Sequence, residues 1–422
     1  MENLLARAMG RKASLASQLE GQTALDLGLG MGDRHYLDWN ATAPLRPEAR
    51  AAMRAALDLV GNPSSVHQEG RQARHWVEQA RAEVAVLLGA EARNVVFTSG
   101  GTEANMLALT PALQVGADRR PRDRLLASAI EHSSVRGGGR FPAAGITEIR
   151  VTAAGVVDLA HLQAELDAAS ARGERVLVAV MAANNETGVI QPVRAVADRV
   201  HMAGGLLHVD AVQACGRIAI DINALGADLL TVSAHKIGGP QGVGALVRRD
   251  QALYFPDPLI KGGGQERGLR AGTENVAGIV GFGAAAAAVR ERLDREAAGM
   301  SGLRDRIESG LRAIAPDTVI FGAEAARVPN TVLLAVPGMR AETALIALDL
   351  AGIAASAGAA CSSGKVAPSH VLAAMGVPPA LAAGAIRISF GHLTAEREVE
   401  CFLQAWRKCV ASLGKDRQGI AA

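Results

Sequence analysis

The stretch TVSAHKIGGPQGVGAL, residues 231–246, ends an apolar run on a histidine and a lysine, Lys236. A lysine at the end of a buried strand is costly as an ammonium ion. Burial therefore lowers its pKa and makes the neutral amine available for a Schiff base. Taken alone, Lys236 would more simply be a surface lysine that closes a strand. Four further features of the sequence favour the chemical role.

Asp210 ends a second apolar run, GLLHVD. A buried carboxylate without a partner would be expensive there, so we expect a cationic partner. A protonated pyridine nitrogen is such a partner, and an aspartate that faces it makes pyridoxal phosphate an electron sink. Asp210 could instead cap the helix that follows.

A candidate phosphate site lies in FTSGGTEAN, where the pattern changes from strand to helix. The amides of Gly101 and Thr102 and the threonine hydroxyl can hold a phosphate at the N-terminus of the helix. Ser233 and His235, beside the lysine, offer two more donors. The same pattern would also fit a well-capped helix without a ligand.

Three polar side chains follow other apolar runs. His132, in IEHSS, could lie flat on an aromatic cofactor or carry a proton. Asn185, in ANNETG, and Gln213, in HVDAVQ, are amides that can reach a phenolate oxygen. Each of the three, considered singly, also fits a structural role.

Cys361 lies in SAGAACSSGKVAPSH, a run of small residues that cannot bury a thiol in a packed core. Cys401 and Cys409, in contrast, fall in a helical pattern and fit buried structural positions. Arg387 stands in the middle of the apolar run AIRISF, where an arginine needs an anionic partner. A substrate carboxylate would serve.

The elements that position these residues form an alternating pattern between residues 94 and 289. Short apolar runs, polar or glycine-rich turns and helical stretches follow one another, which predicts an α/β fold with a parallel sheet flanked by helices. In such sheets ligands bind beyond the carboxyl ends of the strands. After residue 291 a long amphipathic helix and the strand candidates DTVIFG, NTVLLAV and AIRISFG predict a smaller α+β C-terminal domain.

The expected division of the chain follows from this change. We expect an N-terminal extension over residues 1–35, a large domain over 36–290 and a small domain over 291–422 that carries the cysteine loop. Residues 36–50 are a candidate to pack with the small domain.

Composition excludes several classes of protein. The 44 basic and 42 acidic residues are spread along the chain without a block of one sign, so no nucleic-acid or membrane patch is indicated. No apolar run reaches the length of about 20 residues that spans a bilayer. The four cysteines lack C-x-x-C spacing, which indicates neither a metal site nor a disulfide framework. A cytoplasmic location is the expectation.

Taken in order, these motifs resemble the cysteine desulfurases, which are fold type I pyridoxal-phosphate enzymes of the class V aminotransferase group. The matching stretches begin at Tyr36 and are YLDWNATAP, GNPSSVHQEG, FTSGGTEAN, EHSS, NNETGVIQPV, HVDAVQACG, SAHKIGGPQGVGAL, RAGTENVAGIVG, SAGAACSSG and IRISFG. The resemblance implies a large domain with a seven-stranded-type sheet and pyridoxal 5'-phosphate as cofactor.

The resemblance also implies a role for each candidate residue. Lys236 would bind the cofactor, Asp210 would pair with its ring nitrogen and His132 would stack on the ring. The other implied roles are contact with the ring oxygen (Asn185, Gln213), phosphate binding (Gly101, Thr102, Ser233, His235, and Thr273 from the neighbouring subunit) and substrate binding (Asn185, Arg387). The role of Thr273 requires a homodimer.

The implied reaction removes sulfur from L-cysteine, leaves a persulfide on Cys361 and releases alanine. The segment CSSGKVAPSHVL resembles the long-loop branch of the family, which delivers sulfur to iron-sulfur scaffolds and other acceptor proteins. Trp39 replaces a family asparagine and is expected to affect the pocket entrance, and residues 1–35 have no counterpart. Two alternatives stay open: another fold type I lyase or aminotransferase, such as a selenocysteine lyase, and a non-catalytic scaffold.

Overall fold

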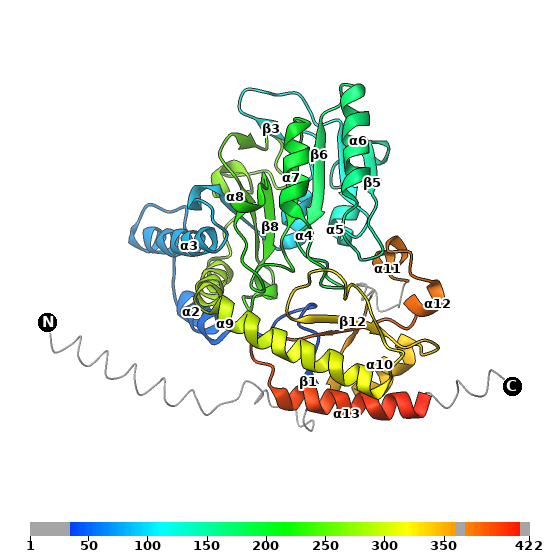
Figure 1. Cartoon of the computed structure of the whole chain (residues 1–422). Coiled ribbons are helices and arrows are strands. Elements are labelled where there is room, and N and C mark those ends of the chain that lie inside the picture. The colour runs from blue at the N-terminus through cyan, green and yellow to red at the C-terminus, as the bar shows by residue number, and fades with distance from the viewer. Residues whose placement is uncertain (1–33, 359–367, 414–422) are drawn as a thin grey trace, which may run out of the picture. The chain divides into compact units, whose positions relative to one another are not determined.

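A seven-stranded sheet forms the centre of the molecule (Figure 1). The structure is a computed structural model that describes residues 34–358 and 368–413. The strands are β2 (Val95–Thr98), β4 (Arg124–Ser128), β5 (Ile146–Ile149), β6 (Val176–Met181), β7 (Leu206–Asp210), β8 (Leu229–Ser233) and β9 (Gly244–Arg248). They lie in the order β2-β9-β8-β7-β6-β4-β5, and every neighbouring pair is parallel except the two that involve β9. The predicted, mostly parallel sheet is confirmed.

Helices cover both faces of this sheet. They are α2 (Pro47–Leu57), α3 (Gln68–Leu87), α4 (Gly101–Ala108), α5 (Ser133–Arg136), α6 (Leu159–Ala171), α7 (Val193–Met202), α8 (Ile222–Leu225) and α9 (Val276–Ile314). Val178 and Val180 of β6 pack with α3, α6, α7 and α9 on one face. Leu177 and Ala179 pack with α4 and α5 on the other. Because both faces are buried, central strands such as β6 are apolar throughout, whereas the edge strand β5 is only partly buried.

A smaller antiparallel sheet lies in the C-terminal part, in the order β11-β12-β15-β14. Its elements are β11 (Val319–Ile320), β12 (Thr331–Ala335), β14 (Ser356–Ala357) and β15 (Ile386–Ser389), with the helices α10 (Ala341–Leu350), α11 (His370–Ala374), α12 (Pro379–Ala382) and α13 (Glu396–Leu413). The core of this part contains Val332, Ile388 and Phe402, and it also takes in Leu37 and Trp39 from the N-terminal segment. This is the smaller α+β unit that the sequence predicts.

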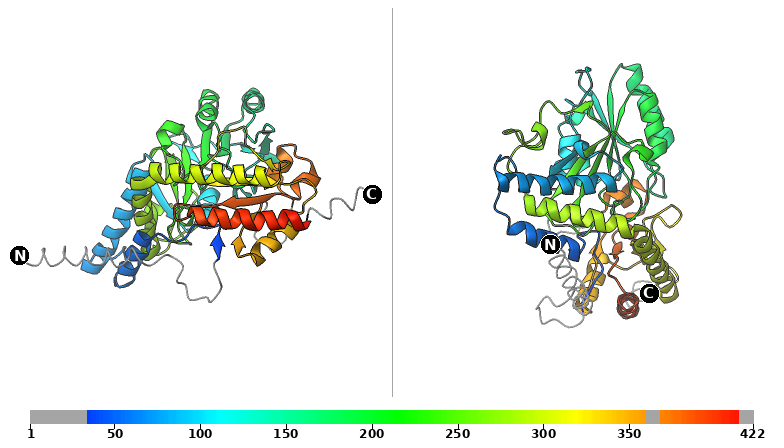
Figure 2. Two further views of the ribbon diagram at one scale, coloured as in Figure 1. Left: turned by 60° about the horizontal axis from the view of Figure 1, so that its bottom comes forward. Right: turned by 90° about the vertical axis from the view of Figure 1, so that its left-hand side faces the viewer.

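Helix α9 connects the two parts without a break. It starts beside α2 and α3 and ends alongside α13 (Figures 1 and 2). The change of pattern near residue 291 therefore falls inside one helix, and the domain limits 36–290 and 291–422 stay a prediction. Two short strand pairs, β1 (His35–Tyr36) with β13 (Ile353–Ala354) and β3 (Gln114–Val115) with β10 (Leu253–Tyr254), lie outside the two larger sheets.

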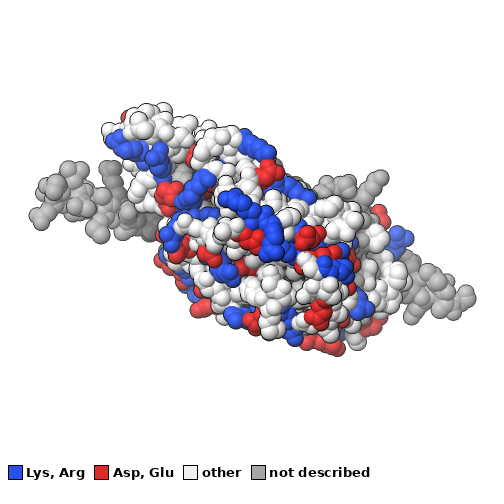
Figure 3. Space-filling view, turned by 90° about the horizontal axis from the view of Figure 1, so that it is seen from above, with Lys and Arg blue, Asp and Glu red and all other residues white. Residues whose placement is uncertain are grey.

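The surface carries both signs of charge. Basic and acidic side chains are interspersed on the face shown in Figure 3. Ion pairs such as Arg124 with Glu174 and Arg175 with Asp118, both with N to O distances of 2.8 Å, neutralise part of this charge. Within residues 34–358 and 368–413, no helix has the length and apolar character needed to cross a membrane. The same residues contain no cluster of three or more side chains suited to hold a metal ion.

Candidate active site

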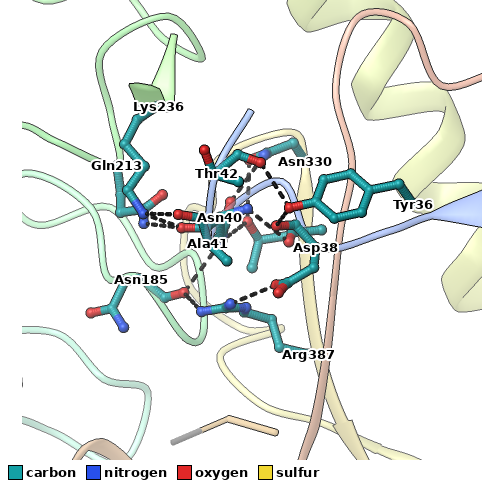
Figure 4. Close-up of polar contacts among 12 residues, drawn as sticks. Tyr36, Asp38, Asn40, Ala41, Thr42, Asn185, Gln213, Lys236, Asn330 and Arg387 are labelled. Atoms are coloured by element: carbon teal, nitrogen blue, oxygen red, sulfur yellow. Dashed lines mark hydrogen bonds and ion pairs between the residues drawn. The ribbon is translucent and has the colours of Figure 1, made fainter. Parts of the chain in front are cut away.

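Lys236 lies in a single 3-10 turn directly after strand β8. Its Nζ donates to the main-chain carbonyl oxygens of Asn40 and Ala41, the latter at 2.8 Å (Figure 4). Burial, followed by the positive charges of Arg217 and Arg387, lowers the pKa of Lys236 to about 7. A large fraction of this amine is therefore neutral near pH 7, as a nucleophilic lysine requires.

Asn40 links Lys236 to several other site residues. Its carbonyl oxygen also accepts a hydrogen bond from Gln213 Nε2 at 3.0 Å. Its Nδ2 donates to the Asn185 carbonyl at 3.3 Å, and its Oδ1 accepts from Asn330 Nδ2 at 3.2 Å. Sequence reasoning missed Asn40 because these partners are 145 to 290 positions away. Its only signal was its place in the matching stretch YLDWNATAP.

Arg387 projects from β15 toward the same segment and is 4% exposed. Its Nη1 donates to the Asn185 carbonyl at 2.9 Å, and its Nη2 pairs with Asp38 Oδ1 at 2.8 Å (Figure 4). The sequence suggested a substrate carboxylate as the anionic partner, whereas the structure shows that Asp38 already fills this role. Within the described part of the chain Nε of Arg387 is buried without a partner, which leaves it free for a ligand.

Asp210 and His132 are joined through two side chains that the sequence did not single out. The Asp210 carboxylate accepts from Asn105 Nδ2 at 2.8 Å and from the Val212 amide at 3.0 Å. Asn105 Nδ2 also donates to Ser134 Oγ at 2.9 Å, and Ser134 Oγ lies 2.8 Å from Nδ1 of His132. Both donors to Asp210 are neutral groups, so they orient the carboxylate without forming an ion pair with it.

A pocket of about 440 Å³ lies next to Lys236, at the N-terminus of α4. Its lining consists of Ala41, Thr42, Ser99, Gly100, Gly101, Thr102, Glu103, Ser233, His235, Gln241 and Gly242. The structure thus brings together four of the five residues expected to bind phosphate, and Thr273, expected from the neighbouring subunit, does not line this pocket. Burial, followed by the charges of Lys236 and Arg217, lowers the pKa of His235 to about 4, so its imidazole is neutral at pH 7.

Glu103 places a carboxylate in the lining of this pocket, which sequence reasoning did not consider. Its Oε1 accepts from Arg270 Nε at 3.0 Å, and its Oε2 accepts from the Ser99 amide at 2.9 Å. Burial raises the pKa of Glu103, but these hydrogen bonds outweigh it and bring the pKa below its ordinary value. Arg270 therefore offsets a negative charge that would otherwise oppose an anion in the pocket.

The remaining candidates are Cys361, Thr273 and Trp39. Cys361 lies outside the described residues, between Gly358 and Pro368 in the sequence. Thr273 is exposed in the segment before α9. Trp39 is buried in the core of the smaller unit, where its ring meets His392 edge to face at 5.4 Å between centroids. It does not line the larger pocket, but it lines a cavity of about 20 Å³ that Arg217 and Lys236 also line.

Comparisons with known proteins find several that are similar to this chain in sequence and in structure. The family model for class-V aminotransferases matches residues 35–402. A cysteine desulfurase from Enterobacter agglomerans is 42% identical, over 90% of this chain and 93% of that protein. Among solved structures, the NifS-like protein from Rickettsia africae is 35% identical with a TM-score of 0.79, covering 90% of this chain and 100% of that one. SspA in complex with cysteine has a TM-score of 0.70 at 29% identity, with coverage of 84% and 98%.

The chain belongs to the cysteine desulfurases. It is therefore a pyridoxal-phosphate-dependent enzyme of fold type I, as the resemblance implied.

The residues of this cysteine desulfurase fit the cofactor. Asn185 Oδ1 and Gln213 Oε1 are buried and have no partner among the described residues. Because the two ends of an amide side chain are assigned from their surroundings, either end can turn to a ligand. Gly101 lines the phosphate pocket and faces Val212, and a Cβ on it would lie 3.1 Å from that side chain, so a larger residue would crowd this part of the lining.

Proposed function

We propose that Lys236 holds the cofactor and that Cys361 receives the sulfur of L-cysteine. When bound, the cofactor supplies an electron-poor ring that stabilises the negative charge left on a substrate carbon after loss of a proton. Lys236 is suited to take up and return that proton at Nζ, since its pKa of about 7 allows both protonation states at neutral pH. The lowered pKa of Lys236 beside the phosphate pocket is the observation that carries this proposal.

The surrounding residues have the roles that the family pattern implies. Asp210 would hold the protonated ring nitrogen, and the hydrogen bond from Asn105 keeps its carboxylate oriented. His132 would stack on the ring, and Asn185 and Gln213 would contact the ring oxygen. The pocket at the N-terminus of α4 would hold the phosphate, because main-chain amides and the hydroxyls of Thr102 and Ser233 are available there. Arg387 binds the substrate carboxylate through its free Nε.

The sulfur step needs no external oxidant. The thiolate of Cys361 attacks the substrate sulfur, a sulfur–sulfur bond forms and the bond between Cβ and sulfur in the substrate breaks. The electron pair of that bond stays with the substrate carbon, which takes up a proton and leaves as alanine. The enzyme keeps the sulfur as a persulfide on Cys361.

Cys361→Ser tests the assignment. The variant should keep the absorbance of the lysine-bound cofactor and lose nearly all alanine formation from cysteine. Lys236→Ala should lose that absorbance together with activity. Undiminished alanine formation by Cys361→Ser would instead favour a lyase that uses Lys236 alone.

We further propose a cytoplasmic homodimer that passes its sulfur to an acceptor protein such as an iron-sulfur scaffold. Thr273 is exposed and so is available to a neighbouring subunit. Leu57, Val60 and Val66, in and after the end of α2, are 72%, 83% and 83% exposed, which is unusual for apolar side chains unless another surface covers them. Sedimentation of the purified enzyme tests the homodimer, and transfer of labelled persulfide sulfur to proteins of its own cell extract tests the acceptor protein.

A further inference from the structure

The two residues after Pro368 form hydrogen bonds with the large domain. Ser369 caps helix α11, because its Oγ accepts a hydrogen bond from the Leu372 amide at 3.0 Å. The hydroxyl proton then points to Glu186 Oε2, which lies 2.5 Å away. Ser369 is 4% and Glu186 is 2% exposed, so the bond is shielded from water.

The next residue, His370, forms a second hydrogen bond with the large domain. The Nε2 of His370 lies 3.0 Å from the main-chain carbonyl of Glu131 and acts as donor, since a carbonyl can only accept. Burial lowers the pKa of His370, which favours the neutral ring with a proton on this nitrogen. Val371 and Leu372 pack beneath these bonds against Ile130 of the large domain.

Glu186 also lies close to Gly358, the last described residue before segment 359–367. A Cβ on Gly358 would come within 3.2 Å of Glu186 Oε2, so this carboxylate is in close contact with the chain just before residue 359. The Gly358 amide donates to the Ala385 carbonyl at 3.2 Å. One glutamate therefore contacts both the residue that precedes segment 359–367 and the cap of the helix that follows it.

The two residues that accept these hydrogen bonds, Glu131 and Glu186, are neighbours in the sequence of residues assigned to the cofactor. Glu131 directly precedes His132, and Glu186 directly follows Asn185. We propose that Glu186 is a positioning residue for sulfur transfer, which, together with the Glu131 carbonyl, holds the described residues on either side of segment 359–367 beside the loops that carry His132 and Asn185. This inference rests on the proposed function, because it assumes that Cys361 receives the sulfur.

Either protonation state of Glu186 can serve this role. Burial raises the pKa of Glu186 to about 7, and Ser369 and Arg387 oppose that shift. The ionised carboxylate accepts from Ser369, and the carbonyl oxygen of the neutral acid can do the same. Glutamine keeps such an oxygen at the same reach, whereas alanine leaves the Ser369 hydroxyl without an acceptor.

The test compares Glu186→Gln, Glu186→Ala and Ser369→Ala as cofactor-loaded enzymes, with Glu342→Ala on the exposed face of α10 as a matched control. Three quantities are measured: alanine turnover, the change in cofactor absorbance on mixing with cysteine, and the alkylation rate of Cys361 by iodoacetamide. We expect Glu186→Ala and Ser369→Ala to lose about tenfold or more in turnover and to change the alkylation rate. The absorbance change should stay within about twofold, because cysteine still binds. Glu186→Gln should keep at least about half of the turnover.

Two outcomes would overturn the inference: unchanged turnover in Glu186→Ala, or a loss of the cysteine-induced absorbance change in proportion to turnover. The second would show a structural role only. If Glu186→Ala does not fold, as judged by its melting temperature, Ser369→Ala takes its place in the test. Turnover that is unchanged in Ser369→Ala, or lost in proportion to the cysteine-induced absorbance change, would then overturn the inference, with Glu186→Gln as the conservative comparison. Cys361→Ser is measured in parallel, and full activity of that variant would contradict the proposed function itself rather than the role of Glu186.

Discussion

The Nδ2 of Asn105 lies 2.8 Å from Oδ2 of Asp210 and holds this carboxylate at the end of strand β7. Asn105 is 1% exposed and stands on α4, the helix whose N-terminus opens into the phosphate pocket. One buried amide therefore connects the element assigned to the phosphate with the carboxylate assigned to the ring nitrogen.

Asn105→Ala should weaken cofactor binding by about tenfold, because a buried hydrogen bond to a charged group is lost. The dissociation constant for pyridoxal 5'-phosphate is measured by absorbance titration of the cofactor-free protein. Asn94→Ala is the matched control, since Asn94 is equally buried and donates to the Arg249 carbonyl away from the pocket. The control should lose stability without a change in affinity. Equal losses of affinity in both variants would argue against the role of Asn105.

The amine of Lys236 should react with acylating reagents at neutral pH in the cofactor-free protein. Its labelling rate should rise with pH and level off above about pH 7, where the amine is neutral. Mass spectrometry of the labelled peptides measures the profile, and exposed Lys408 supplies the reference in the same digest. A rate that keeps rising to pH 10 would rule out the lowered pKa.

Burial of Lys236 should also make the stability of the cofactor-free protein depend on pH. Its pKa is 10.5 in the unfolded chain and about 7 in the fold, so the unfolded state binds more protons between these values. The contribution of Lys236 to the free energy of unfolding therefore rises with pH across this window. Lys236→Met should remove that rise, which urea unfolding at pH 7 and pH 9 can detect. An unchanged difference between the two pH values would contradict the assignment.

Arg387→Lys should raise the KM for cysteine by about tenfold or more. An ammonium group cannot replace the planar guanidinium group, which Asp38 and the Asn185 carbonyl hold in a fixed orientation. Steady-state kinetics gives the value. Arg327→Lys tests a second buried ion pair, with Glu308 at 2.6 Å, and should lower stability while KM stays the same. If the KM of Arg387→Lys equals that of the wild type, Arg387 does not bind the substrate carboxylate.

Trp39→Asn, the residue of the family pattern, should destabilise this protein. The variant removes a ring that is 6% exposed and places a polar amide in the core, at a cost of about 3 kcal/mol or more. Urea unfolding measures the loss, and Trp76→Asn on the surface of α3, where the ring is half-buried, should cost less. Cofactor affinity of the folded Trp39→Asn protein should stay close to that of the wild type. Equal stability of the wild type and this variant would show that neighbouring side chains refill the site.

Much of the candidate site was predictable because its residues occupy strand ends. Lys236, Asp210 and Ser233 follow apolar runs, and parallel strands bring their carboxyl ends to one edge of a sheet. The glycines before Thr102 likewise indicated the start of α4. These are local signals that any reader of the chain can find.

Other partners could not be found in this way. Asp38 pairs with Arg387 across 349 positions, and Glu186 meets Ser369 across 183 positions. No local pattern marks them, because a carboxylate in a loop has the same appearance in the sequence whether it is solvated or buried. Trp39 shows the same limit, since its burial follows from the packing of the N-terminal segment on the smaller sheet.

The sequence by itself determined the α/β class, the strand-end positions of the polar residues and, through the order of its motifs, the family. Hydrophobic periodicity and turn residues act over a few positions and are sufficient for the first two features, whereas the family follows from the resemblance of the ordered motifs. Only the tertiary structure decided that Asn40 forms hydrogen bonds with Lys236, Gln213 and Asn185, and that Asp38 forms an ion pair with Arg387. These contacts depend on how the N-terminal segment lies between two sheets, which the packing of both cores fixes together.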